Sequence, residues 1–113
     1  MVAIVRAQVI EKIRQIYPAQ DVDVVLALLD RYGGEVHHRE RPRVQMAILK
    51  LCDEEARLDP TPYVEAACAD YRDVLAWAES PNLFKSPQVT DPEEREKLTA
   101  ADEAQYLAWL EER

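Results

Sequence analysis

The scarcity of glycine is the strongest constraint on how this chain folds. The 113 residues include two glycines, and these are adjacent, at Gly33 and Gly34. Glycine supplies backbone angles that other residues avoid, and helices need few such angles. The residues are 48% hydrophobic and 32% charged, which is typical of a globular chain and not of a disordered one. The sequence therefore predicts a single all-α domain, long enough to bury a core.

Four stretches in residues 1–80 repeat apolar side chains at spacings of three and four, the pattern of an amphipathic helix. The predicted helices cover residues 2–16, 19–32, 42–52 and 61–79. Pro18 ends the first helix and Pro81 ends the fourth. Because Val24 and Leu28 widen the apolar stripe of the second helix, we expect that helix to be central. Together these helices predict an antiparallel four-helix bundle.

The rest of the chain is predicted to be an arm and a helix. Residues 81–98 contain prolines and no periodicity, which indicates a linker, with a short helical turn opening at Pro92. Thr99 is predicted to cap a last helix over residues 99–113, with Asp102 three residues on in a capping-box-like pattern. Large apolar residues of this part are the predicted contacts to a partner. They are Leu83, Phe84, Tyr106, Trp109 and Leu110.

The net charge of −8 is concentrated near the C-terminus, since residues 91–113 carry −5 and residues 1–90 carry −3. An acidic surface repels phosphate backbones, so nucleic-acid binding is not expected. No apolar stretch is long enough to span a membrane, and the first residues lack the pattern of a secretion signal. Cys52 and Cys68 do not form a disulfide framework. These features predict a cytoplasmic protein.

Two short segments, LAWAE at 75–79 and LAWLE at 107–111, are nearly identical, and LALLD at 26–30 is similar. Their spacings of 49 and 32 residues differ, whereas a repeat array keeps one period. We interpret them as the buried ends of separate helices.

Two resemblances follow from longer patterns. The segment VVLALLDRYGG…RPRVQMAILKL resembles one antiparallel helix pair of HEAT-like repeats. The wider pattern RVQMAILKL…DYRDVLAWAE, within residues 17–80, resembles uncharacterised small bacterial all-α proteins. Neither resemblance implies an activity, a cofactor or a ligand.

Polar residues offer few candidates for chemistry. His37 and His38 could form a zinc site with Cys52 and Cys68, but neighbouring loop residues diverge, so two exposed histidines are the favoured interpretation. Asp70 is the one acid at the edge of an apolar stripe. No phosphate-binding glycine loop or nucleophile motif occurs. We expect no catalytic residue, metal or cofactor.

Arginines gather in the segment HHRERPR, at Arg39, Arg41 and Arg43. Such a cluster can bind phosphate or carboxylate groups. An intramolecular role is the alternative, in which these arginines pair with the acidic tail or with residues 53–55.

Three functions remain as hypotheses. The first is a protein–protein interaction module in which the arm and last helix contact a partner or a second copy. The second is a small acidic inhibitor, similar to an antitoxin or immunity protein, that blocks a basic partner. The third, and the least favoured, is a metal- or nucleotide-dependent enzyme.

Overall fold

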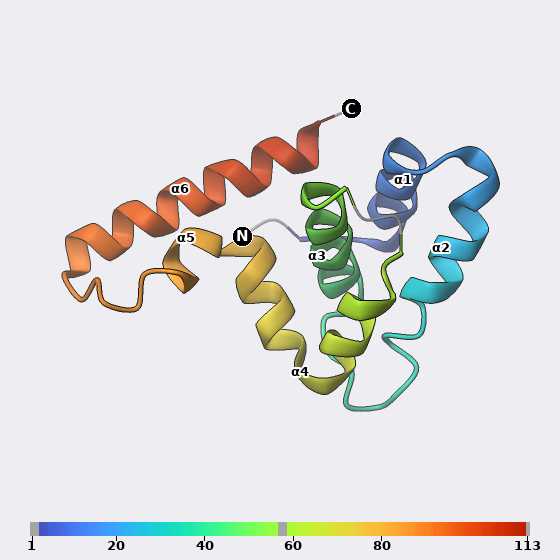
Figure 1. Ribbon diagram of the computed structural model, residues 1–113, viewed down its shortest axis with the longest axis horizontal. Coiled ribbons are helices and arrows are strands. Elements are labelled where there is room, and N and C mark those ends of the chain that lie inside the picture. The colour runs from blue at the N-terminus through green and yellow to red at the C-terminus, as the bar shows by residue number, and fades with distance from the viewer. Residues whose placement is uncertain (1–2, 57–58, 113) are drawn as a thin grey trace.

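A computed structural model describes residues 3–56 and 59–112, and the regular structure within them is entirely helical (Figure 1). In chain order the elements are α1 (Arg6–Ile16), the short 3-10 turn η1 (Ala19–Asp21), α2 (Val22–Leu29), α3 (Arg41–Glu54), α4 (Thr61–Glu79), α5 (Pro81–Phe84) and α6 (Pro92–Glu111). The predicted all-α class is confirmed. The packing of α1 to α4 is compatible with the predicted four-helix bundle.

Helix α3 forms the centre of the core. Every residue from Val44 to Cys52 is buried, including the polar residues Gln45 and Lys50. Helices α1 and α4 both pack against α3, whereas α2 packs on α1 and α4 at the edge (Figure 1). The prediction that the second helix is central is therefore wrong, and its Val24 is 61% exposed. The number of neighbours, and not the width of the apolar stripe, decides which helix is central.

Asp30, just after α2, forms hydrogen bonds with side chains of α1 and α3 and so links three helices. The Arg6 guanidinium of α1 donates to both carboxylate oxygens at 2.8 Å, and Arg41 of α3 donates to Oδ1 at 2.9 Å. The side-chain amide of Gln45 donates to Asp30 Oδ1 at 3.1 Å and to the Leu29 carbonyl at 2.9 Å. The Arg6 hydrogen bonds, aided by Arg41 and Gln45, hold the pKa of Asp30 well below its usual range.

Helix α4 bends at Asp70. The backbone angles of Asp70, φ −158° and ψ 102°, are extended and interrupt the helix, and the ribbon changes direction within α4 (Figure 1). Asp70 Oδ1 accepts the backbone N–H of Arg72 at 3.0 Å, the contact that an N-cap residue makes. Hydrogen bonds from Arg72 also lower the pKa of Asp70. The acid singled out in the sequence thus caps the second half of α4.

Helix α6 is longer than the sequence predicts. The prediction that it begins at Thr99 is wrong, because Thr99 lies inside α6 and its Oγ1 donates to the Arg95 carbonyl at 3.0 Å. The predicted boundary between residues 98 and 99 therefore falls within a helix. Pro92 suits a first helical turn, and Glu93 and Glu94 lie near the positive end of the helix dipole.

Candidate protein-interaction site

The part of the chain after α4 is far less buried than the part before it. From Glu79 to Gln105, a stretch that the structure describes throughout, a single residue is buried, and that residue is Asp102. Helix α5 and the first half of α6 pack on each other and extend away from α1, α2 and α3 (Figure 1). We call residues 81–101 the arm, and the helices α1 to α4 the body. The arm presents most of its side chains to solvent.

Asp102 fixes α5 against α6. Its side chain is 2% exposed, Oδ1 accepts the backbone N–H of Asn82 at 3.1 Å, and Oδ2 accepts that of Leu83 at 3.0 Å. The first N–H groups of a helix have no partner inside the helix, so a carboxylate satisfies them well. The predicted capping box is therefore wrong, because Asp102 caps α5 and not α6. The partners lie 19 and 20 residues earlier in the chain, beyond the reach of a local sequence pattern.

A hollow of about 300 Å³ is lined by residues of α5, of α4 and of the end of α3. We call it the α5 groove; it is lined by Leu51, Glu54, Glu55, Tyr63, Trp77, Pro81, Phe84 and Lys85. Phe84 is 52% exposed, and Tyr63 and Trp77 are half-buried. Aromatic side chains that are partly withdrawn from water are enriched at the centres of protein interfaces. The α5 groove therefore has the composition of a docking surface.

The α5 groove carries both signs of charge. Exposed Lys85 follows α5, and the acids Glu54 and Glu55 stand at the end of α3. Glu54 accepts a hydrogen bond from the buried ammonium of Lys50, and Glu55 accepts one from the Tyr63 hydroxyl. These hydrogen bonds orient the two acids at the edge of the aromatic surface.

The five predicted contact residues are in different environments. Tyr106 and Trp109 are 9% and 8% exposed and belong to the core of the chain itself. Leu83 and Leu110 are half-buried, and Phe84 is the one of the five that is exposed. The structure brings Phe84 into the α5 groove and Leu110 into a second groove described below. The role of all five in binding a partner stays a prediction.

Hydrogen bonds from two side chains, Trp109 and Lys12, hold the end of α6 on the body. The Trp109 indole N–H donates to Asp53 Oδ2 at 2.7 Å. The Lys12 ammonium, on a side chain that is 5% exposed, donates to the carbonyls of Trp109 at 2.6 Å and Glu112 at 3.1 Å, and it lies 4.3 Å from the centre of the indole ring. Burial lowers the pKa of Lys12. A cation at the carbonyl end of a helix is favourable, so this contact anchors α6.

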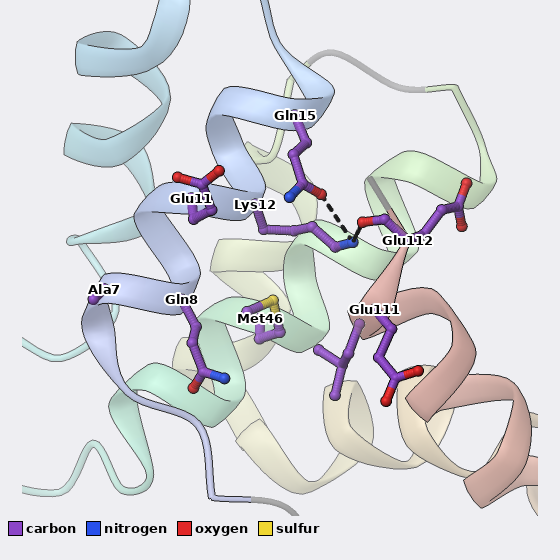
Figure 2. A pocket seen from close by; sticks show the side chains of 9 residues that line it. Ala7, Gln8, Glu11, Lys12, Gln15, Met46, Glu111 and Glu112 are labelled. Atoms are coloured by element: carbon purple, nitrogen blue, oxygen red, sulfur yellow. Dashed lines mark hydrogen bonds between the residues drawn. The ribbon is translucent and has the colours of Figure 1, made fainter.

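A larger hollow, of about 700 Å³, lies between α1 and the end of α6 (Figure 2). We call it the α1–α6 groove; it is lined by Ala7, Gln8, Glu11, Lys12, Gln15, Met46, Leu110, Glu111 and Glu112. In Figure 2, Glu11 extends from α1 on one side, Glu111 from α6 on the other, and Met46 lies between them. Lys12 crosses toward Glu112 at one end.

The histidine pair lies beside a third hollow, of about 270 Å³, which is also lined by Cys68 and Asp70. The His38 ring stacks on Tyr32 with centroids 4.5 Å apart, and its Nδ1 accepts the backbone N–H of Gly33 at 2.8 Å. Among residues 3–56 and 59–112, no three His, Cys, Asp or Glu side chains are grouped so that they could hold a metal ion. The contacts of His38 serve the connection between α2 and α3.

The arginine segment is largely engaged within the chain. Arg41 pairs with Asp30, and Arg43 donates to both carboxylate oxygens of Glu79 at 2.8 and 2.6 Å. These two arginines therefore have an intramolecular role, but the predicted partners are wrong. The partners are Asp30, Glu40 and Glu79, and neither the acidic tail nor residues 53–55.

Comparison of this chain with known proteins identified no related protein. No protein-family model matches the chain, and no curated protein or solved structure does so either. Within the described ranges, none of the helices has both the length and the apolar content that a membrane span requires.

Tyr63 and Trp77 are the groove residues that sequence reasoning missed. Trp77, in the second half of α4, packs against the core while remaining half-buried. The sequence does contain a signal for its partial exposure. Trp77 lies one turn before Pro81, which ends the helix, so the last turn of α4 has neighbours on fewer sides.

Proposed function

We propose that this chain is a protein–protein interaction module that forms a homodimer through the α5 groove. The observation that carries the proposal is the exposure of Phe84 beside two further aromatic side chains, Tyr63 and Trp77, at the margin of a hollow. Phe84 is 52% exposed, and removing the exposed part of this side chain from water makes association with a partner more favourable.

The charges of the groove support a second copy as the partner. In a two-fold dimer each surface patch meets the same patch of the other copy. Lys85 from the α5 side then faces Glu54 and Glu55 from the α3 side of the other copy, and the pairing occurs twice. A patch that carries an apolar centre and both charges is complementary to itself.

The shape of the molecule supports the same arrangement. The dimensions of the chain are 47 × 32 × 24 Å, and the arm forms one end of the longest direction (Figure 1). An arm that projects from the body can reach over a second copy and bury surface there. The proposal assigns no catalytic step to the chain.

The acidic inhibitor is the second candidate, and the exposed acids of the arm favour it. Glu93, Glu94 and Glu96 stand on the first half of α6 and are all exposed. A basic active site would be attracted to this surface, and its association would weaken steeply with added salt. Association through the α5 groove depends on apolar contact and tolerates salt.

Sedimentation equilibrium over a wide range of protein concentration tests the proposal. The variant Phe84→Glu places a charge in the groove, and Val24→Glu is the matched control, because Val24 is 61% exposed on α2. We expect the unaltered chain and Val24→Glu to form dimers in low and high salt, and Phe84→Glu to remain monomeric. A monomeric unaltered chain, or a Phe84→Glu variant that still dimerises, would contradict the proposal.

A further inference from the structure

The α1–α6 groove is a second surface, and among the residues that the structure describes the two grooves have no lining residue in common. Its floor is apolar, formed by Met46 of α3 and Leu110 of α6. Met46 is 2% exposed and belongs to the core, so the floor of the groove is continuous with the interior of the body. Methionine adapts its shape readily, which suits a surface that receives apolar side chains of a partner.

Three carboxylates stand around this apolar floor. Glu11 lies on α1, and Glu111 and Glu112 lie at the end of α6, so the acids flank the floor from two sides (Figure 2). All three are exposed, and none forms an ion pair with another residue in the part of the chain that the structure describes. Their charges are therefore available to a bound cation.

The position of two of these acids is unfavourable for the helix itself. The carbonyl end of a helix carries partial negative charge, which repels the negative carboxylates of Glu111 and Glu112. Lys12 is the one base among the described lining residues, and its ammonium is directed at backbone carbonyls and at the Gln15 amide oxygen, not at carboxylates. The described lining therefore has three acids and one base, and Lys12, which interacts electrostatically with Glu112, offsets only part of the acidic charge. Local rules of this kind are most often broken where a surface serves binding.

We propose that the α1–α6 groove binds a basic amphipathic segment of a partner protein. An apolar side chain of that segment packs on Met46 and Leu110, while lysine or arginine side chains pair with the acids on either side. A volume of about 700 Å³ is large enough for more than one side chain of such a segment.

A second copy of this chain is a poor match for this groove. Its net charge is −8, and two of the three arginines of its most basic segment are engaged, Arg41 with Asp30 and Arg43 with Glu79. The partner that we propose is therefore another protein, with a basic surface of its own.

The test uses a fluorescently labelled synthetic peptide in which leucine and lysine follow helical spacing, and binding is measured by anisotropy. Two control peptides replace all lysines by glutamate or all leucines by serine. The triple variant Glu11→Gln, Glu111→Gln, Glu112→Gln removes the groove charges while keeping side-chain size. The matched triple variant Glu93→Gln, Glu94→Gln, Glu96→Gln removes the same charge from the arm, where all three acids are also exposed.

We expect the leucine–lysine peptide to bind the unaltered chain, and both control peptides to bind much more weakly. The groove variant should lose about tenfold or more in affinity, since it removes several charge-assisted contacts, and the arm variant less than about threefold. Phe84→Glu should bind the peptide as the unaltered chain does, which separates this proposal from the dimer. The proposal is overturned by equal losses in the two triple variants, by loss of binding in Phe84→Glu, or by an unaltered chain that does not bind the peptide.

Discussion

The body and the arm use their residues in opposite ways. In the body, nine consecutive residues of α3, from Val44 to Cys52, are buried, whereas the arm has no buried residue and is held by Asp102 of α6. The body therefore derives its stability from burial of apolar surface. The arm depends on polar contacts and on its attachment to the body. Phe84 lies in the arm and is 52% exposed, so its side chain contributes less to burial than the side chains of α3 do.

The first half of α6 shows how the arm keeps its helix with little burial. Lys97 pairs with Glu94 at 3.3 Å, and the Arg95 guanidinium donates to the Val89 carbonyl at 2.9 Å. Such exposed contacts contribute little individually. The residues are good helix formers, and the second half of the same helix is docked on the body through Trp109. Helical order is thus extended from the docked half into the arm.

The largest difference between the two regions should appear on shortening an apolar side chain. Ile48→Ala in α3 opens a cavity at a residue that is 0% exposed, and we expect it to lower the free energy of unfolding by about 2–5 kcal/mol. Leu98→Ala in the arm shortens a half-buried side chain, and its cost should be below about 1 kcal/mol. Urea denaturation measures both, and equal costs would show that the arm is a part of the core.

Asp102 provides the next largest effect. Asp102→Ala leaves the N–H groups of Asn82 and Leu83 without their acceptors, at a cost of about 1–3 kcal/mol in the docking of α5. Hydrogen exchange should accelerate at these two amides and remain unchanged in α3. Asp102→Asn keeps one acceptor oxygen and should have an intermediate effect. Slow exchange at both amides in the alanine variant would exclude the capping role.

A smaller effect is expected at the bend of α4. Asp70→Ala removes the cap of the second half of the helix, so it should lower the melting temperature by less than Asp102→Ala does, and mainly loosen the helix near Arg72. Asp73→Ala, an exposed acid one turn further along the same helix, is the control and should change little. Thermal melts followed by circular dichroism measure both variants. Equal melting temperatures of Asp70→Ala and Asp73→Ala would show that Asp70 does not cap the helix.

The smallest effect is a pH dependence that arises in the body. The pKa of Asp30 is lower in the folded chain than in the unfolded chain, so its stabilising contribution is complete above the unfolded pKa and is lost as the pH falls through and below that value. Between about pH 5 and pH 2 the unaltered chain should lose about 1 kcal/mol more stability than Asp30→Asn, a modest value because Arg6 and Arg41 are partly exposed. Parallel pH profiles of the two proteins would show that the Asp30 contacts contribute nothing.

The sequence predicts the helical class and the helix ends that prolines mark, because these depend on local features, whereas α2 ends at Leu29 and α5 lies in the predicted linker. Pro18 and Pro81 mark the ends of helices by restricting the backbone of their neighbours. The apolar period does not reveal which helix has the most neighbours. For this reason the pattern indicated the second helix as central, whereas α3 is. Thr99 was expected to start a helix because threonine is a common cap, but a helix former precedes it at every position back to Glu93.

The candidate sites were less predictable, since both grooves join residues that are distant in the chain. Phe84 and Leu110 are singled out by their size and position in the sequence. Their neighbours Leu51 and Met46 come from α3, and only the fold brings them together. Asp102 illustrates the same limit, because its pattern indicates a local cap while its partners belong to α5.

The most direct test of the account is hydrogen exchange of the unaltered chain at low and high protein concentration. If the arm is the binding region and the body supplies stability, the amides from Asn82 to Lys85 should exchange more slowly as the concentration rises, while exchange in α3 between Val44 and Leu49 remains the same. Exchange from Asn82 to Lys85 that is independent of concentration would contradict the claim that the α5 groove binds a second copy.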